Sequence, residues 1–200
     1  MTDPGQFTET RWIDVGPRAK TPIDAIATAG RTGSANARAA EFLWCERGHG
    51  GLPRVQLFPS YEAAARNVLD GTASHLLVSN GHPDIATFYE DTNLRFSSAF
   101  LHSTPYVLVG DVPLDFEAPR VAVPAGLSTV AARLLAEHFP SFVVSNVGHD
   151  DEAVAAVRGD RADVTVLTSD KASACALPVL PGRHTSRMLW TVFLPSAPVQ

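Results

Sequence analysis

The chain has 200 residues, enough for one well-buried core or two small lobes. Apolar residues make up 45% and charged residues 18%, a globular balance that argues against wholesale disorder. The net charge is −5 and no basic run occurs, which argues against nucleic acid or an anionic membrane surface as a partner. Cys45 and Cys175 lie far apart, with no neighbouring cysteine to complete a zinc site. We therefore expect no metal and no cofactor, and two buried thiols in a reducing compartment.

The N-terminal segment, residues 1–20, shows little periodicity, and its first part, MTDPGQFTETRW, is polar and acidic. We expect it to be a flexible tail, although Trp12 and Ile13 could dock on the body. It lacks the apolar core of a signal peptide, and no apolar run approaches the roughly 20 residues that a membrane span needs. The expectation is a cytoplasmic protein without a membrane partner.

A glycine-rich turn joins the first predicted strand to the first predicted helix. Residues 23–28 indicate an extended lead-in and residues 35–45 a helix, with the sequence AGRTGSANARAA across the junction. Ser34 is placed to cap the helix, since its hydroxyl can hold a free N–H group of the first turn. Unpaired N–H groups and the positive end of the helix dipole bind anions at such a position, and Arg31 adds positive charge. The simpler interpretation is a strand-to-helix turn that needs glycine only for its backbone.

The rest of the chain alternates strands and helices in two similar cycles. In the first cycle we expect strands at 55–58 and 75–80, a helix at 61–69, a loop at 81–84 and an extended segment at 94–110. In the second we expect strands at 119–124, 142–146, 162–170 and 189–195, with helices at 130–139, 150–160 and 171–177. Because strands that alternate with helices form parallel sheets, the predicted fold class is α/β, with two Rossmann-like lobes around a central cleft.

Polar residues at the carboxyl ends of the strands are candidate ligand contacts, since parallel sheets bind ligands there. If the two lobes face each other, the residues around the cleft are Ser34, Ser79, Asn80, Ser128, Thr129, Thr168 and Ser169. Each set could equally consist of turn residues that satisfy their own backbone. The acidic run at 150–152 is expected only to stabilise the positive end of a helix, and His149 beside it does not complete a metal site.

The order and spacing of these segments resemble the catalytic domain of the prephenate dehydratases over about residues 23–195. The family's opening Gly-Pro-Glu-Gly-Thr turn is matched by residues 30–34, and YEAAARNVLDGTASHLLVSN and DEAVAAVRGDRADVTVLTSD are similar to a helix and strand of each lobe. The segment PDIATFYEDTNLRFSSAFLHSTPYVLV most closely resembles the short stand-alone prephenate decarboxylases of the bacilysin-pathway type. The resemblance implies a fold like that of type II periplasmic binding proteins. Lobe 1 would span residues 21–103, completed by about 186–200, and lobe 2 residues 104–185.

Two departures from the dehydratases bear on the reaction. Their last strand carries a Thr-Arg-Phe motif, whose threonine is thought to help the ring hydroxyl leave; here leucine stands first in Leu189-Trp190-Thr191, although a small shift would bring in Thr191. Their Pro-Ile-Glu-Asn-Ser segment becomes residues 79–83, without its acid. The resemblance therefore implies a lyase that decarboxylates prephenate or a close analogue without aromatising it, in specialised metabolism such as antibiotic biosynthesis. The alternatives are a dehydratase-like lyase giving an aromatic product, an isomerase of a related acid, and a cytoplasmic small-anion binding protein without catalysis.

A non-aromatising decarboxylase must bind carboxylates and deliver a proton to a ring carbon. The proton could come from a histidine, since histidine titrates near neutrality, or from the carboxyl group of the substrate. The catalytic candidates are His82, His102 and Thr104, the last before Pro105 as in a Thr-Pro of the decarboxylases. The substrate-binding candidates are Arg31, Thr32, Ser34, Asn36, Ser79, Asn80, Ser128, Thr129 and Trp190. Each also has an ordinary role open to it: a solvated turn, a satisfied buried histidine, a surface arginine or a core tryptophan. The expected partner is a small anionic carboxylate, and a homodimer is possible because the dehydratase family commonly pairs its domains.

Overall fold

The computed structural model describes residues 12–15 and 21–196. Its strands are β1 (Trp12–Asp14), β2 (Ile26–Ala29), β3 (Val55–Phe58), β4 (His75–Ser79), β5 (Leu94–Gly110), β6 (Arg120–Pro124), β7 (Val143–Val147), β8 (Val164–Thr168) and β9 (His184–Pro195). Its helices are α1 (Ala35–Arg47), α2 (Tyr61–Leu69), α3 (Ile85–Glu90), α4 (Ser128–Ala136), α5 (Asp150–Arg158) and α6 (Ser169–Cys175). In the described part of the chain, no helix has the length and apolar character needed to cross a membrane.

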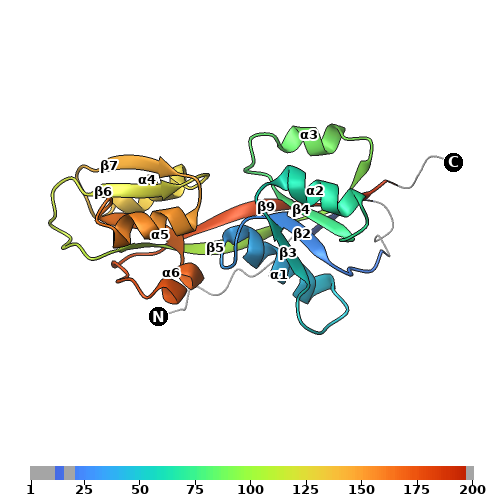
Figure 1. Ribbon diagram of the computed structural model, residues 1–200, viewed down its shortest axis with the longest axis horizontal. Coiled ribbons are helices and arrows are strands. Elements are labelled where there is room, and N and C mark those ends of the chain that lie inside the picture. The colour runs from blue at the N-terminus through green and yellow to red at the C-terminus, as the bar shows by residue number, and fades with distance from the viewer. Residues whose placement is uncertain (1–11, 16–20, 197–200) are drawn as a thin grey trace, which may run out of the picture.

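The elements form two lobes, as the alternation of strands and helices predicts (Figure 1). The first lobe contains β2, β3 and β4 with α1, α2 and α3, and the second contains β6, β7 and β8 with α4, α5 and α6. Parallel pairs join β2 to β3 and β4, and β6 to β7 and β8. The fold is therefore α/β, with a short parallel sheet at the centre of each lobe.

Two long antiparallel strands, β5 and β9, run from one lobe into the other and make the described strands one continuous sheet (Figure 1). Along the sheet the order is β3-β2-β4-β9-β5-β8-β6-β7, with β1 paired to β5. The predicted lobe limits at 103/104 and about 186 fall inside these strands, so no loop separates the lobes there. The limits themselves stay a prediction.

Each lobe buries its own apolar core. In the first lobe, Leu76 and Phe193 pack with α2 on one side of the sheet, and Leu77 and Trp190 pack with α1 on the other. In the second lobe, Leu134 and its neighbours in α4 cover one side of the sheet, and smaller apolar groups from α5 and α6 cover the other. At about 25 cal/mol per Å² of apolar surface, such burial is the main stabilising contribution.

The N-terminal segment is a strand where it is described. Trp12–Asp14 pair with β5, and the Trp12 ring lies 4.7 Å from that of Phe100, between centroids. Trp12 thus docks on the body, the alternative that the sequence analysis left open for it, and it does so by adding an aromatic ring to those of Phe42 and Phe100. Residues 1–11 and 16–20 of the predicted tail lie outside the described residues.

Local differences from the expected elements concern the cleft most. Helix α3 follows the expected loop at 81–84, in a segment for which the sequence analysis predicted no element, and α4 begins two residues before the predicted start at 130. Strand β9 begins at His184, five residues earlier than predicted, because it pairs with β5 far into the second lobe. Of the two thiols expected to be buried, Cys175 is buried, whereas Cys45 is exposed.

Candidate functional site

Two adjoining cavities lie between the lobes. The arginine cavity, about 330 Å³, takes its walls from the turn at 29–36 and from the segment before α5; among its lining residues are Arg31, Ser34, His149 and Asp150. The tryptophan cavity, about 470 Å³, lies over β5 and β9; among its lining residues are His82, Thr104, Met188 and Trp190. Both cavities share Ala35, Asn36, Tyr106, Ala125 and Leu127, so they form one cleft. Their volumes suit a small organic ligand.

The N-terminus of α1 forms the first wall of this cleft. Ser34 caps the helix as predicted, its Oγ accepting a hydrogen bond of 3.3 Å from the Ala37 N–H. The N–H groups of Ala35 and Asn36 have no acceptor within α1, because a helix leaves its first turn unpaired. Gly30 has φ +116°, and a side chain there would meet Ser34 Oγ at 2.8 Å. Glycine is thus required both by the turn and by the cap.

Asn36 lines both cavities, and the N–H₂ group of its side chain is already hydrogen-bonded within the protein. Its Nδ2 donates to the Ala29 carbonyl and to the Tyr61 hydroxyl, each at 2.8 Å. The amide oxygen, an acceptor, is what remains for a ligand. Asn36 therefore lines the cleft as predicted, but it cannot offer its N–H₂ group to a carboxylate without giving up these bonds.

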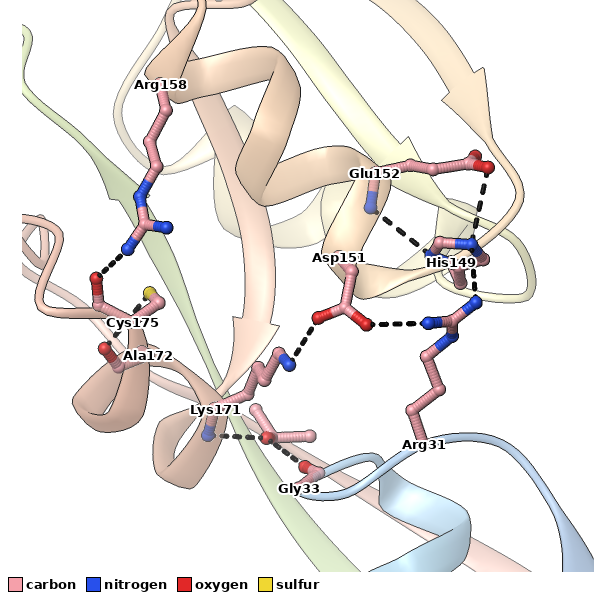
Figure 2. Close-up of polar contacts among 10 residues, drawn as sticks. Arg31, Gly33, His149, Asp151, Glu152, Arg158, Lys171, Ala172 and Cys175 are labelled. Carbon is pink, nitrogen blue, oxygen red and sulfur yellow. Dashed lines mark hydrogen bonds and ion pairs between the residues drawn. The ribbon is translucent and has the colours of Figure 1, made fainter. Parts of the chain in front are cut away.

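Arg31 reaches from the first lobe to the second (Figure 2). Its guanidinium lies 3.2 Å from Asp151 Oδ2 and 3.1 Å from His149 Nε2, and Lys171 Nζ holds Asp151 Oδ1 at 2.6 Å. The Lys171 hydrogen bond lowers the pKa of Asp151, with further help from the charges of Lys171, Arg31 and His149. Thr168 Oγ1 adds a hydrogen bond of 2.8 Å to the Gly33 carbonyl. These contacts hold the lobes together at the arginine cavity.

The tryptophan cavity has no Lys, Arg, Asp or Glu among its lining residues. Trp190, 2% exposed, forms its floor with Met188 and Leu127. Thr104 is 4% exposed, and neither its hydroxyl nor the Trp190 indole N–H has a hydrogen-bond partner in the described part of the chain. Buried polar groups usually have partners, so unpaired ones in a cavity wall mark a place where a ligand can supply them.

His82 and Tyr61 complete one side of the tryptophan cavity. Their ring centroids lie 4.8 Å apart, and His82 Nε2 is 3.8 Å from Glu62 Oε1. The Tyr61 hydroxyl accepts from the Ser79 N–H at 3.3 Å, and burial raises the pKa of Tyr61 to about 12. Tyr61 is therefore a neutral phenol at physiological pH.

The structure brings seven of the predicted site residues to the cleft: Arg31, Ser34, Asn36, Ser79, His82, Thr104 and Trp190. It leaves five outside the lining of both cavities: Thr32, Asn80, His102, Ser128 and Thr129. Thr32 is exposed within the turn. Ser128 and Thr129 are exposed in the first turn of α4, because this helix starts earlier than predicted and the cleft wall is made by residues 125–127.

His102 and Asn80 are excluded for different reasons. His102 shares a sheet face with Met188, its partner in β9, but the ring of Phe42 from α1 covers it at 4.9 Å between centroids. Burial lowers the pKa of His102, which fits a neutral packed imidazole. Asn80 accepts a hydrogen bond of 2.6 Å from Thr191 Oγ1. Thr191 is itself fully buried and bonded to the Tyr89 hydroxyl at 2.7 Å.

Among the lining residues that the sequence analysis did not propose are Tyr106, His149 and Asp150. Tyr106 is two residues beyond Thr104 in β5, so strand alternation could have placed it on the same face. Burial and the nearby Asp150 carboxyl both raise the pKa of Tyr106. His149 caps α5, its Nδ1 accepting from the Glu152 N–H at 3.3 Å. No cluster of three or more potential metal ligands occurs within residues 12–15 and 21–196.

The solved structures similar to this chain support the two-lobed fold. Prephenate dehydratase from Arthrobacter aurescens, in complex with L-Phe, superposes with a TM-score of 0.63 at 14% identity, covering 86% of this chain and 61% of its own. Prephenate dehydratase from Staphylococcus aureus Mu50 superposes with a TM-score of 0.60 at 11% sequence identity. The match covers 85% of this chain and 66% of the dehydratase. GqqA, described as a novel type of quorum-quenching acylase, superposes with a TM-score of 0.60 at 17% sequence identity. The match covers 88% of this chain and 65% of GqqA.

A periplasmic substrate-binding protein of an ABC transporter from Coxiella burnetii is also similar, with a TM-score of 0.53 at 12% identity, covering 86% of this chain and 84% of its own. No protein-family model matches the sequence, and no curated protein matches it. The chain thus shares the fold of prephenate dehydratases and periplasmic binding proteins, and it spans about two thirds or less of the dehydratases it matches.

Proposed function

We propose that this protein is a lyase that decarboxylates prephenate, or a close analogue, without aromatising the ring. The dehydratase-like fold supports the substrate class, because the two dehydratase structures share this architecture. The cleft supports the choice of reaction. The remaining expectations, a cytoplasmic setting, a role in specialised metabolism such as antibiotic biosynthesis and pairing as a homodimer, are parts of the same proposal.

The observation that carries the proposal is the absence of a charged side chain among the described residues lining the tryptophan cavity. A ring carboxylate bound there would give up its hydration shell without gaining a cation as partner. The free energy of the bound ground state would therefore rise. The charge spreads into the ring as carbon dioxide leaves, so the same surroundings disfavour the transition state less. The second carboxylate of the substrate would lie in the arginine cavity, near Arg31 and the free N–H groups of α1.

The position of Thr191 argues against dehydration. A dehydratase must protonate the departing ring hydroxyl, and Thr191 was the residue that a small shift in alignment could bring to that role. Its hydroxyl is bonded to Asn80 and Tyr89, away from the cleft lining. The ring hydroxyl of the substrate would thus gain no second proton from Thr191 and would stay on the ring.

Met188→Lys tests the role of the uncharged cavity, since lysine has nearly the volume of methionine and adds a cation to this wall. Purified wild type and variant are mixed with prephenate, and substrate loss is followed by ultraviolet absorbance beside calorimetric binding. We expect the wild type to release carbon dioxide, and Met188→Lys to bind prephenate more tightly while kcat falls about 10-fold or more, an order-of-magnitude expectation for one new charge pair. The matched control is Met188→Leu, which keeps the wall apolar and should keep kcat within about threefold. A Met188→Lys enzyme with unchanged kcat and tighter binding would remove the argument from the uncharged cavity.

A second function of another class is binding without catalysis. The ion pair between Arg31 of the first lobe and Asp151 of the second bridges the lobes beside the cleft, where a binding protein would hold its ligand. Saturable binding of prephenate by the wild type, with no turnover, would favour this function and exclude the lyase. An isomerase of a related acid would instead yield a product of unchanged mass.

A further inference from the structure

Two consecutive aspartates at the start of α5 have opposite surroundings. Asp151 is bonded to Arg31 and Lys171, and its pKa is lowered (Figure 2). Asp150 lines the arginine cavity, and its carboxyl group makes no hydrogen bond or ion pair within the described parts of the chain. Neighbouring carboxyl groups whose environments separate their pKa values are typical of sites with distinct acid and anion roles.

The groups around Asp150 explain its state. Burial raises the pKa of its carboxyl, and the negative charge of Asp151 acts in the same direction. Lys171 and His149 oppose this shift, but the Lys171 ammonium is already held by Asp151 at 2.6 Å. From β5, the Tyr106 phenol faces Asp150 and remains neutral, since its own pKa is raised. Arg31, the remaining cation of this cavity, is paired with Asp151.

Asp150 lines the arginine cavity together with Tyr106. Tyr106, which senses the Asp150 charge, lines the arginine and tryptophan cavities together. A ligand that spans both cavities passes this junction. Of the histidines considered from the sequence, His102 is covered by Phe42 and lines neither cavity. His82 lines the tryptophan cavity, and its Nε2 lies 3.8 Å from Glu62 Oε1.

We propose that Asp150 is the proton donor of the decarboxylation, an inference that rests on the proposed function. The bond between the ring carbon and its carboxylate breaks, and its electron pair enters the ring as a new double bond. The adjacent ring double bond shifts, and the carbon at its far end takes the proton of the Asp150 carboxyl. Carbon dioxide leaves, the ring hydroxyl stays, and the Asp150 carboxylate regains a proton from water.

Asp150→Asn tests the role, because it keeps the shape of the side chain and removes the acid. We expect kcat with prephenate to fall at least about 100-fold, the usual contribution of a general acid, while the dissociation constant of prephenate changes by less than about threefold. Asp150→Glu should restore part of kcat. Asp160→Asn, the same chemical change in the exposed turn after α5, should leave kcat and the pH profile unaltered.

The pH dependence adds a readout that does not depend on any variant folding. Carbon NMR of the wild-type carboxyl groups should show Asp150 titrating above the usual range of aspartate, and the basic limb of kcat should follow that titration. An ordinary or lowered pKa for Asp150, or wild-type kcat in Asp150→Asn, would overturn the inference and leave the proposed function standing. A wild type that does not release carbon dioxide from prephenate would overturn the proposed function and this inference with it.

Discussion

Replacing Thr104 by valine should raise stability and weaken binding at the same time. The Thr104 hydroxyl is buried in the wall of the tryptophan cavity and has no hydrogen-bond partner in the part of the chain that the structure describes. Leaving such a group unpaired costs about 1–3 kcal/mol, and valine removes it while keeping the shape. The free energy of unfolding of Thr104→Val should therefore rise by about 1 kcal/mol or more, which for a chain of this size raises the melting midpoint by about 2–4 °C.

The effect on binding has the opposite sign. In the complex we expect the Thr104 hydroxyl to turn from its buried position and to hydrogen-bond a ligand in the tryptophan cavity. Losing that hydrogen bond should cost about 0.5–1.5 kcal/mol, so the dissociation constant of prephenate should rise about 2- to 13-fold. Calorimetry measures the dissociation constant, and thermal unfolding of the unliganded protein measures stability.

Thr191→Val is the matched control for this prediction. Thr191 is also fully buried, but its hydroxyl bonds Asn80 Oδ1 at 2.6 Å and the Tyr89 hydroxyl at 2.7 Å. Its removal should lower stability by about 1–3 kcal/mol and leave prephenate affinity nearly unchanged. If Thr104→Val instead melts at a lower temperature, or binds prephenate like the wild type, then the Thr104 hydroxyl is not the unsatisfied group that the argument requires.

Two further predictions concern the turn and the pH dependence of stability. Gly30→Ala should destabilise the fold by about 1–3 kcal/mol and weaken prephenate binding, because φ is +116° and the added methyl meets Ser34 Oγ; unfolding in urea measures this, and an unchanged midpoint would contradict it. Burial lowers the pKa of His75 to about 4. The unfolded chain takes up this proton below about pH 6.5 and the folded protein only near pH 4, so the free energy of unfolding should fall by up to about 3 kcal/mol as the pH drops through that window. His75→Gln should flatten this part of the stability profile, and an identical slope in the variant would refute the assignment.

The sequence predicts the elements whose cause is local. Ser34 caps α1 and Ser60 caps α2 where the hydroxyls precede an apolar helical pattern, and both helices begin at the predicted residue. The end of β4 separates two neighbouring candidates of the site. Ser79 is the last residue of β4 and lines the cleft, whereas Asn80 lies in the turn after it and accepts a hydrogen bond from Thr191.

Other parts of the site depend on contacts between distant segments. His102 and Thr104 share one face of β5, but only His102 is covered by Phe42, and the packing of α1 decides this. In the sequence, Asp150 looks like any acidic residue in the first turn of a helix. Its exposure to the cavity arises where α5 meets β5, some forty residues away in the chain. Residue patterns within single elements do not contain that information.

The mass of the product formed from prephenate tests the central claim most directly. The wild type should convert prephenate to a compound that is lighter by carbon dioxide alone, keeps the ring hydroxyl and lacks the ultraviolet absorbance of an aromatic ring. A product lighter by both carbon dioxide and water, with the absorbance of phenylpyruvate, would show dehydration and contradict the proposed reaction.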